Sequence, residues 1–185
     1  DLNGLVKKNK DCIGYVEIPG TTISYPVMQT KDNPQYYLRR DFNKQYSYMG
    51  TPFMDSRCDI NYDNNLIVYG HNMKVGGEMF SQLNEYASED FYKAHPYFYI
   101  YTPDGKTRTY EVFSARVVKD SAEVYNLNIT TDEEFEAYLA ECKSTSNYVT
   151  SPGVDRNSKI VSLSTCTNVN EDERFLLQGV LIKEE

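Results

Sequence analysis

Alternating apolar and polar positions, broken by turn residues, run through most of the chain. Residues 13–18 alternate and stop at Pro19-Gly20, while residues 66–69 form a continuous apolar run typical of a buried strand. Pro103-Asp104-Gly105 separates two further runs and predicts a hairpin. These patterns predict strands over 13–18, 23–28, 66–69, 97–102, 107–118, 159–165 and 175–182, with residues 46–54 extended.

Helical signals are fewer and fall outside these strands. Thr131 and Glu134 form a capping-box pattern, so a helix is predicted over 131–142. Apolar residues recur at helical spacing over 78–87, and shorter helical segments are predicted over 2–10 and 34–40. Many short strands with few helices favour a β-barrel or β-sandwich over an alternating βα fold.

Composition and charge narrow the class further. The 185 residues are 40% apolar and 25% charged, which suits one globular domain, taken as residues 1–185. Seventeen tyrosines and no tryptophan favour β structure. The net charge of −8 disfavours nucleic acid and a polybasic grip on anionic lipid. No apolar stretch is long enough to span a membrane, and the start at Asp1 without Met indicates a processed or truncated form.

The four cysteines leave two interpretations open. They could form two disulfides in an exported protein, or remain buried thiols with one of them reactive. With no CxxC, two histidines and no acidic cluster at calcium-loop spacing, we expect neither a metal site nor a cofactor.

Three residues at predicted strand ends could together support nucleophilic catalysis. Cys166 ends the strand over 159–165, His71 follows the strand over 66–69, and Arg174 opens the last strand. A cysteine nucleophile needs a base and a donor that stabilises the oxyanion. Taken singly, each has a plainer interpretation: Cys166 as a buried apolar residue, His71 as a structural histidine, and Arg174 as a surface ion pair with neighbouring carboxylates.

The combination closely resembles the sortase family. Ser162-Leu163-Ser164-Thr165-Cys166 is similar to the family's Thr-Leu-x-Thr-Cys strand end, with Ser in place of the first Thr. The string Tyr69-Gly70-His71-Asn72-Met73 and the predicted helix before the cysteine strand resemble class B of that family, and residues 13–21 resemble its N-terminal strand pair. The likeness covers nearly the whole chain.

The resemblance implies a mainly β fold: an eight-stranded sortase-type barrel with an N-terminal helix and a helix inserted before the cysteine strand. It implies a cysteine transpeptidase of Gram-positive bacteria. Such an enzyme cleaves a C-terminal sorting signal of exported proteins, Asn-Pro-x-Thr-Gly or a Pro-x-Thr-Gly relative, between Thr and Gly. A thioester then passes the protein to a peptidoglycan amine. It further implies work at the extracytoplasmic face of the membrane, with an N-terminal anchor missing before Asp1.

The resemblance also suggests roles for single residues. Cys166 would attack, His71 as imidazolium would exchange protons, and Arg174 would hold the oxyanion or a substrate carbonyl. Ser164 and Thr165 would lie along the substrate backbone. Further substrate contacts are expected from Ser121, Tyr125 and Leu38.

Three alternatives remain. A papain-like peptidase would place its cysteine before its histidine and carry a nearby tryptophan, so it fits poorly. A sortase of another class would lack the inserted helix or carry a lid loop. A non-catalytic, tyrosine-rich binding barrel has no need for His71, Cys166 and Arg174 together, and its Cys166 would react no faster than the other three cysteines.

Overall fold

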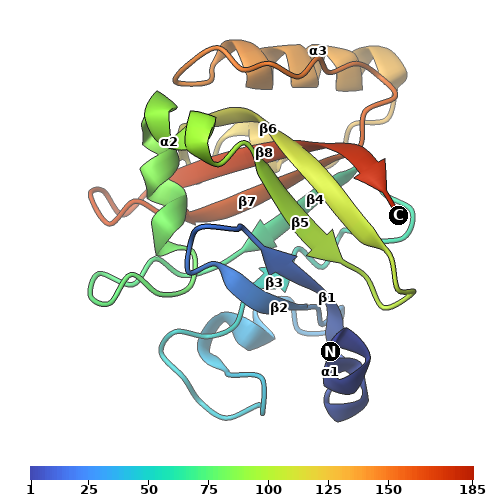
Figure 1. The fold of residues 1–185 in the computed structure, drawn as a ribbon, viewed down its shortest axis with the longest axis vertical. Helices are drawn as coiled ribbons and strands as arrows, with labels where there is room; N and C mark the ends of the chain where they lie inside the picture. The colour runs from blue at the N-terminus through green and yellow to red at the C-terminus, as the bar shows by residue number, and fades with distance from the viewer.

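Eight strands close into a barrel in the computed structural model, which describes residues 1–185 (Figure 1). Around the barrel they follow the order β1, β2, β3, β4, β7, β8, β6 and β5, and β5 pairs with β1. The expected eight-stranded barrel is confirmed. The strands are β1 Cys12–Glu17, β2 Ser24–Met28, β3 Phe53–Met54, β4 Asn65–Tyr69, β5 Tyr97–Tyr101, β6 Thr107–Lys119, β7 Ile160–Cys166 and β8 Glu173–Glu184.

The helical segments lie outside the barrel wall. The α-helices are α1 Leu2–Lys8, α2 Glu89–Ala94 and α3 Asp132–Ser144, and the 3₁₀ turns are η1 Tyr36–Arg39, η2 Ser81–Ala87 and η3 Glu123–Tyr125. Both the N-terminal helix and the helix before the cysteine strand are therefore present, as predicted. None of the helices has the length and apolar character needed to cross a lipid bilayer.

Two local predictions were wrong for backbone reasons. The helix expected over 78–87 is a 3₁₀ segment over 81–87, because Met79 takes a left-handed conformation (φ 57°) that breaks a continuous helix. The extended stretch expected over 46–54 shrinks to β3, because the chain turns at Gly50. Gly50 has φ 61°, and a Cβ there would lie 2.4 Å from the Leu38 carbonyl oxygen, so only glycine fits.

The prediction of Thr131 as the N-cap of α3 is confirmed, and the Glu134 carboxylate bonds the Thr131 hydroxyl instead of its backbone amide. The Thr131 hydroxyl accepts a hydrogen bond from the Glu134 amide at 3.1 Å, which satisfies one of the free donors at the helix start. Leu139 and Cys142 form the buried face of α3 and pack with Phe113 of β6 and the other residues of a cluster outside the barrel. The helix thus covers the outer face of the sheet around β6, β7 and β8 (Figure 1).

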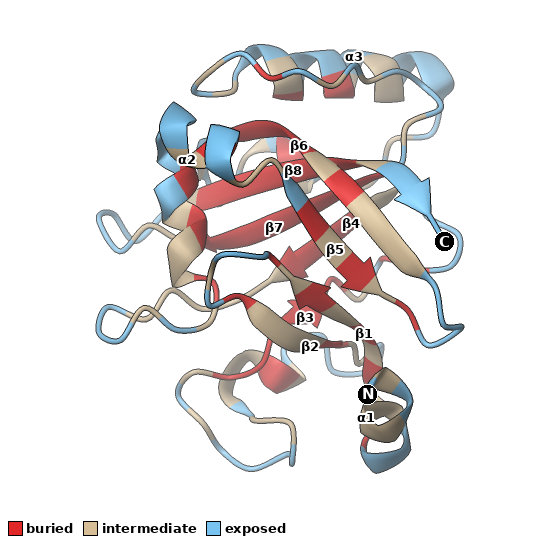
Figure 2. Ribbon diagram, viewed as in Figure 1, coloured by how far each residue is buried: buried red, intermediate tan, exposed pale blue.

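Burial on both faces explains the composition of β7. Residues 160–165 are all buried (Figure 2), with Val161 and Leu163 facing the main core inside the barrel and Ile160 facing the α3 cluster. A strand that is covered on both sides has mostly apolar residues in a continuous run, instead of alternating apolar and polar residues. The main core holds 22 buried residues, so the strand that ends in Cys166 is anchored in the largest of the three buried clusters.

Candidate active site

A cavity of about 530 Å³ opens where β4 and β7 end. Its wall contains all three residues singled out for chemistry and four of the five singled out for substrate contact. These residues are His71, Cys166, Arg174, Leu38, Tyr125, Ser164 and Thr165. Ser121 is the exception: it is exposed in the turn after β6 and does not line the cavity, whereas its neighbour Asp120 does.

Strand pairing brings the histidine and the cysteine to one edge of the sheet. β4 and β7 are parallel, Tyr69 is opposite Ser164, and the Gly70 amide donates to the Ser164 carbonyl at 3.1 Å. His71 and Cys166 each come two residues after this opposed pair. Position 70 must be glycine, because a Cβ there would lie 2.5 Å from the Phe80 ring. In the antiparallel pair of β7 and β8, Cys166 is opposite Arg174, so three adjacent strands supply the three side chains.

Cys166 differs from the other three cysteines in exposure. It is partly exposed, whereas Cys12, Cys58 and Cys142 are buried. All four are free thiols, so of the two interpretations left open by the sequence the structure has buried thiols with one accessible cysteine, not two disulfides. Burial raises the pKa of the Cys58 thiol to about 11. The backbone of Cys166 is fixed from the side, because Asn72 Nδ2 donates to its carbonyl at 2.7 Å. Cys166 is therefore the accessible thiol, on a held strand end.

His71 is half-buried beneath Tyr48 and Arg39. Its ring stacks on Tyr48 with centroids 6.1 Å apart, its Nε2 lies 2.8 Å from the Leu38 carbonyl oxygen, and the Arg39 guanidinium contacts the ring nitrogens. Burial lowers the pKa of His71, the bond to Leu38 opposes this, and the Arg39 charge lowers the pKa further. These surroundings favour the neutral imidazole at rest, in contrast to the imidazolium expected from the resemblance.

His95, the other histidine, lies outside the cavity. It ends α2 and stacks on Phe91 with ring centroids 4.1 Å apart. Its Nδ1 lies 3.1 Å from the Phe91 carbonyl oxygen. His95 is thus part of the packing of α2, and His71 is the histidine of the cavity.

Arg174 is held by backbone carbonyls instead of the acidic loop's carboxylates. Its Nη1 donates to the carbonyls of Glu171 and Glu173 at 2.8 and 2.9 Å, and its Nη2 lies 3.9 Å from an Asp120 carboxylate oxygen. The Asp172 carboxylate pairs with Lys119 instead. Arg174 Nε makes no hydrogen bond within the protein, so the guanidinium keeps donor capacity at the cavity wall.

Polar groups on β7 continue the wall beyond the cysteine. The Ser164 hydroxyl and the Tyr125 hydroxyl are hydrogen-bonded at 2.7 Å, which joins β7 to the segment before α3. Burial raises the pKa of Tyr125. The Thr165 hydroxyl is buried and has no hydrogen-bond partner.

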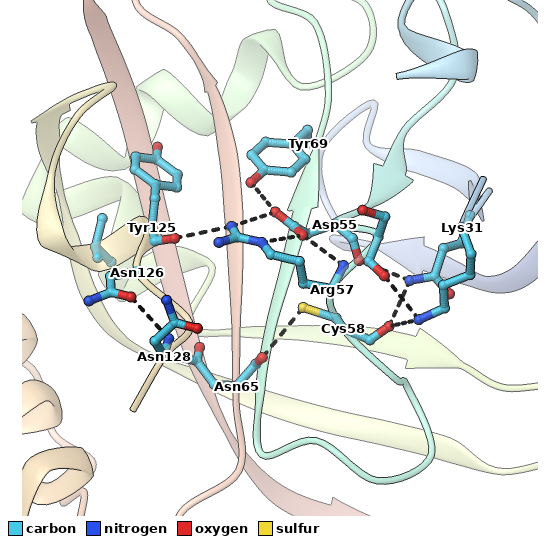
Figure 3. Close-up of polar contacts among 12 residues, drawn as sticks. Lys31, Asp55, Arg57, Cys58, Asn65, Tyr69, Tyr125, Asn126 and Asn128 are labelled. Atoms are coloured by element: carbon cyan, nitrogen blue, oxygen red, sulfur yellow. Dashed lines mark hydrogen bonds and ion pairs between the residues drawn. The ribbon is translucent and has the colours of Figure 1, made fainter. Parts of the chain in front are cut away.

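The cavity wall also holds a charged cluster around Asp55, for which the sequence gives no signal (Figure 3). Asp55 follows β3 and is buried; it accepts hydrogen bonds from Arg57 Nε and Nη2 at 3.0 and 2.9 Å and from the Tyr69 hydroxyl at 2.6 Å. Arg57 Nη2 also donates to the Tyr125 carbonyl at 3.1 Å. Burial alone would raise the pKa of Asp55, but the bonds from Arg57 and Tyr69 outweigh it and lower the pKa. Two polar residues in a loop carry no periodic signal, so their pairing shows only in three dimensions.

The sortase domain family model matches residues 16–182 of the chain. Sortase B of Listeria monocytogenes is 36% identical over 187 residues, which span 98% of this chain and 74% of the relative. The chain belongs to the sortase family. A crystal structure of Clostridium perfringens sortase B is 32% identical, with a TM-score of 0.91 over 99% of this chain and 100% of that one.

The comparisons also support the class. A Staphylococcus aureus sortase B–substrate complex is 29% identical to the chain, with a TM-score of 0.90 over 98% of this chain and 84% of that one. These relatives are all named sortase B, so the resemblance to class B is confirmed. As a member of this family the chain is a cysteine transpeptidase that acts in cell-wall anchoring at the cell surface, not a binding barrel or a papain-like peptidase.

Proposed function

We propose that the chain cleaves a sorting signal of the Asn-Pro-x-Thr-Gly or Pro-x-Thr-Gly type between Thr and Gly, and joins the exported protein to a peptidoglycan amine through a thioester on Cys166. The observation that carries the proposal is the meeting of Cys166, His71 and Arg174 at one cavity, each from the end of a different paired strand. A single accessible thiol and a single histidine on the wall of one cavity are what acyl transfer requires.

In the first half-reaction, neutral His71 takes the thiol proton of Cys166 as the sulfur attacks the Thr carbonyl carbon. The tetrahedral intermediate collapses, the bond between Thr and Gly breaks, and the imidazolium gives its proton to the departing Gly amine. The Thr acyl group remains on Cys166 as a thioester. A histidine held neutral at rest suits this order of proton transfers.

In the second half-reaction, the acceptor amine attacks the thioester. His71 takes a proton from the amine and returns one to the sulfur, which leaves as the Cys166 thiol, so the enzyme is regenerated. Arg174 donates to the carbonyl oxygen while it carries negative charge, since its Nε has no partner within the protein. Lysine lacks the planar fork of donors and replaces it poorly.

The peptide is proposed to lie along β7 toward Tyr125, against Ser164 and Thr165, with Leu38 as an apolar contact. Ser121 has no part in this arrangement, because it lies outside the cavity. We further propose that residues 1–185 form one catalytic domain that works at the outer face of the membrane of a Gram-positive cell. A membrane anchor before residue 1 stays a prediction from the resemblance.

The test uses quenched fluorescent peptides carrying Asn-Pro-Gln-Thr-Gly, Ser-Pro-Lys-Thr-Gly and Leu-Pro-Glu-Thr-Gly, with the cut located by mass spectrometry. We expect cleavage after Thr that disappears in Cys166→Ala and His71→Ala and persists in His95→Ala. A thioester on Cys166, trapped at low pH, would identify the intermediate. Near-normal cleavage by a folded Cys166→Ala protein would overturn the covalent mechanism.

A further inference from the structure

A second cavity of about 320 Å³ adjoins the first and shares Arg57 with it. It lies between the loop that precedes β4 and the segment that leads into α3, and its apolar lining includes Leu127, Ile129 and Phe135. Both signs of charge line it: Arg57 and Arg156 are positive, and Asp63 and Asp132 are negative. The cavity therefore does not favour a ligand of either charge. The two cavities meet at Arg57, whose side chain lines both of them.

Residues 126–130, on the wall of the second cavity, have the features of an unpaired edge strand. Their burial alternates: Asn126, Asn128 and Thr130 are exposed, whereas Leu127 and Ile129 are half-buried. The backbone is extended at Asn126, with φ −82° and ψ 111°, and at Thr131, the residue after the segment, with φ −119° and ψ 154°.

The backbone groups of this edge are largely unused. The only backbone–backbone hydrogen bond of the segment runs from the Asn126 amide to the Glu123 carbonyl, and the Asn128 amide bonds a side chain, Asn126 Oδ1, at 3.0 Å. The amides of Leu127, Ile129 and Thr130 and the carbonyls of residues 126–130 have no protein partner. Such a row of donors and acceptors is a template for an added strand.

The edge is fixed at its end nearest the catalytic cavity. Arg57 donates to the Tyr125 carbonyl, and the Tyr125 hydroxyl bonds Ser164, two residues before the nucleophile. Figure 3 shows Arg57 between Asp55 and Tyr125, with Asn126 and Asn128 following on from Tyr125. A pre-organised edge loses little conformational freedom when it binds a peptide.

The chemistry of transpeptidation indicates which part of the client lies here. The acyl half of the substrate stays bound through both half-reactions, whereas the leaving half departs and the acceptor takes its place. The walled path from Cys166 along Ser164 to Arg57 therefore suits the acyl half, and the chain upstream of the sorting signal leaves it past Arg57.

We propose that residues 126–130 pair as an edge strand with the extended client polypeptide immediately upstream of the sorting signal. This inference rests on the proposed function. Main-chain hydrogen bonds give the affinity, and Leu127, Ile129 and Phe135 favour an apolar side chain at alternate positions of the client. The enzyme thereby recognises more of its client than the five-residue signal.

The experiment compares a five-residue signal peptide with the same signal extended upstream by five residues that alternate Val and Thr. We expect kcat/KM to rise about tenfold for the extended peptide, the effect of two or three net hydrogen bonds, mainly through a lower KM. N-methylation of alternate upstream amides in the extended peptide should remove the gain in one register and spare it in the other, because only one set of amides faces the edge.

A matched pair of variants, Ile129→Pro and Thr130→Pro, tests the enzyme side. Adjacent amides of an extended segment point to opposite sides, so one proline removes a donor from the paired side and the other does not. We expect kcat/KM for the extended peptide, divided by kcat/KM for the short peptide, to fall toward one in only one of the two variants. Circular dichroism checks that both variants are folded.

The outcomes separate this inference from the proposed function. Equal kcat/KM for the two peptides, both cleaved by Cys166, would overturn the edge pairing and leave the proposed function standing. A lower KM for a peptidoglycan stem-peptide acceptor, lost in the same proline variant, would assign the edge to the acceptor and likewise overturn the inference. Cleavage of neither peptide would overturn the proposed function and this inference with it.

Discussion

Two arginines, Arg57 and Arg174, line the candidate active-site cavity, and the protein holds them in different ways. Arg57 forms a two-point hydrogen bond with the buried Asp55 carboxylate and a third bond with the Tyr125 carbonyl. Arg174 bonds two backbone carbonyls of an exposed loop and lies at 3.9 Å from the nearest carboxylate oxygen, that of Asp120. The charge of Arg57 is thus neutralised at close range, and that of Arg174 is not.

This difference separates a structural arginine from one available to substrate. A guanidinium that bonds a carboxylate at two points and a carbonyl at a third is held in place, and its charge is already paired before an oxyanion develops. One held by neutral carbonyls keeps its charge and a free Nε. Residue type and presence on the same cavity wall do not distinguish the two, but their partners do.

The largest effect is expected at Arg174. Arg174→Ala should lower kcat by about 10²-fold to 10³-fold, because the oxyanion loses a charged donor. The kcat of Arg174→Lys should lie between those of Arg174→Ala and the parent protein. Peptide cleavage kinetics measure this, with Lys119→Ala, a nearby surface cation, as the control expected within about twofold of the parent. Equal activity of Arg174→Ala and the control would remove the contrast between the two arginines.

At Arg57 the expected loss is in stability. Arg57→Ala leaves the Asp55 carboxylate buried, with the Tyr69 hydroxyl as its remaining side-chain partner. The free energy of unfolding should therefore fall by about 2 kcal/mol. This is less than for a fully buried ion pair, because Arg57 is half exposed. Urea unfolding measures it. Asp55→Asn in the Arg57→Ala background should recover part of the loss, since the buried charge is then gone.

The pH dependence of that loss provides a check. The pKa of Asp55 is lowered in the folded state, so the stabilisation is present above its ordinary value of 3.8 and is lost as pH falls below 3.8 through the folded pKa. The difference in the free energy of unfolding between the parent protein and Arg57→Ala should therefore become smaller in that acid range. A constant difference down to low pH would mean that the carboxylate is not the group concerned.

A smaller effect is expected at a third arginine, Arg39, which lies against His71. Arg39→Gln removes a nearby positive charge, so the pKa of His71 should rise, as measured by NMR titration of the ring signals with His95 as internal reference. Because the folded pKa of His71 is depressed, stability falls as pH drops below the ordinary value of 6.5, where the unfolded chain binds a proton that the folded chain lacks. That fall should be smaller in Arg39→Gln. An unchanged titration would show that burial alone sets the pKa.

The smallest effect is expected at Thr165. Its hydroxyl is buried without a partner, so Thr165→Val should leave the free energy of unfolding unchanged or raise it by up to about 1 kcal/mol. Thermal unfolding measures it, with Ser164→Ala as the matched change of a hydroxyl that does have a partner. A loss of stability in Thr165→Val equal to that in Ser164→Ala would contradict the assignment.

Features encoded in adjacent residues were predictable from the sequence, and those that depend on distant contacts were not. The cap of α3 at Thr131 and the hairpin at 103–105 involve neighbours only, and both formed as expected. The resemblance to the sortase family predicted the eight-stranded barrel and pointed to Cys166, His71 and Arg174 as the residues of the site. The bond between Asp55 and Arg57, the contact of Arg39 with His71, and the turn at Gly50 each depend on close approach of segments that no local pattern relates.

The parallel pairing of β4 with β7 also has a consequence for how the protein folds. These strands are neighbours in the sheet but lie about 95 positions apart in the chain, so closing that loop is one of the slow, entropically costly steps of folding. His71 and Cys166 meet only after this step. If His71 is the base of Cys166, as proposed, a partly folded chain carries the thiol without its base, and the native reactivity of Cys166 is expected to appear together with the completed barrel. The rate at which a thiol-selective probe gains its native reactivity during refolding would follow the joining of these two strands.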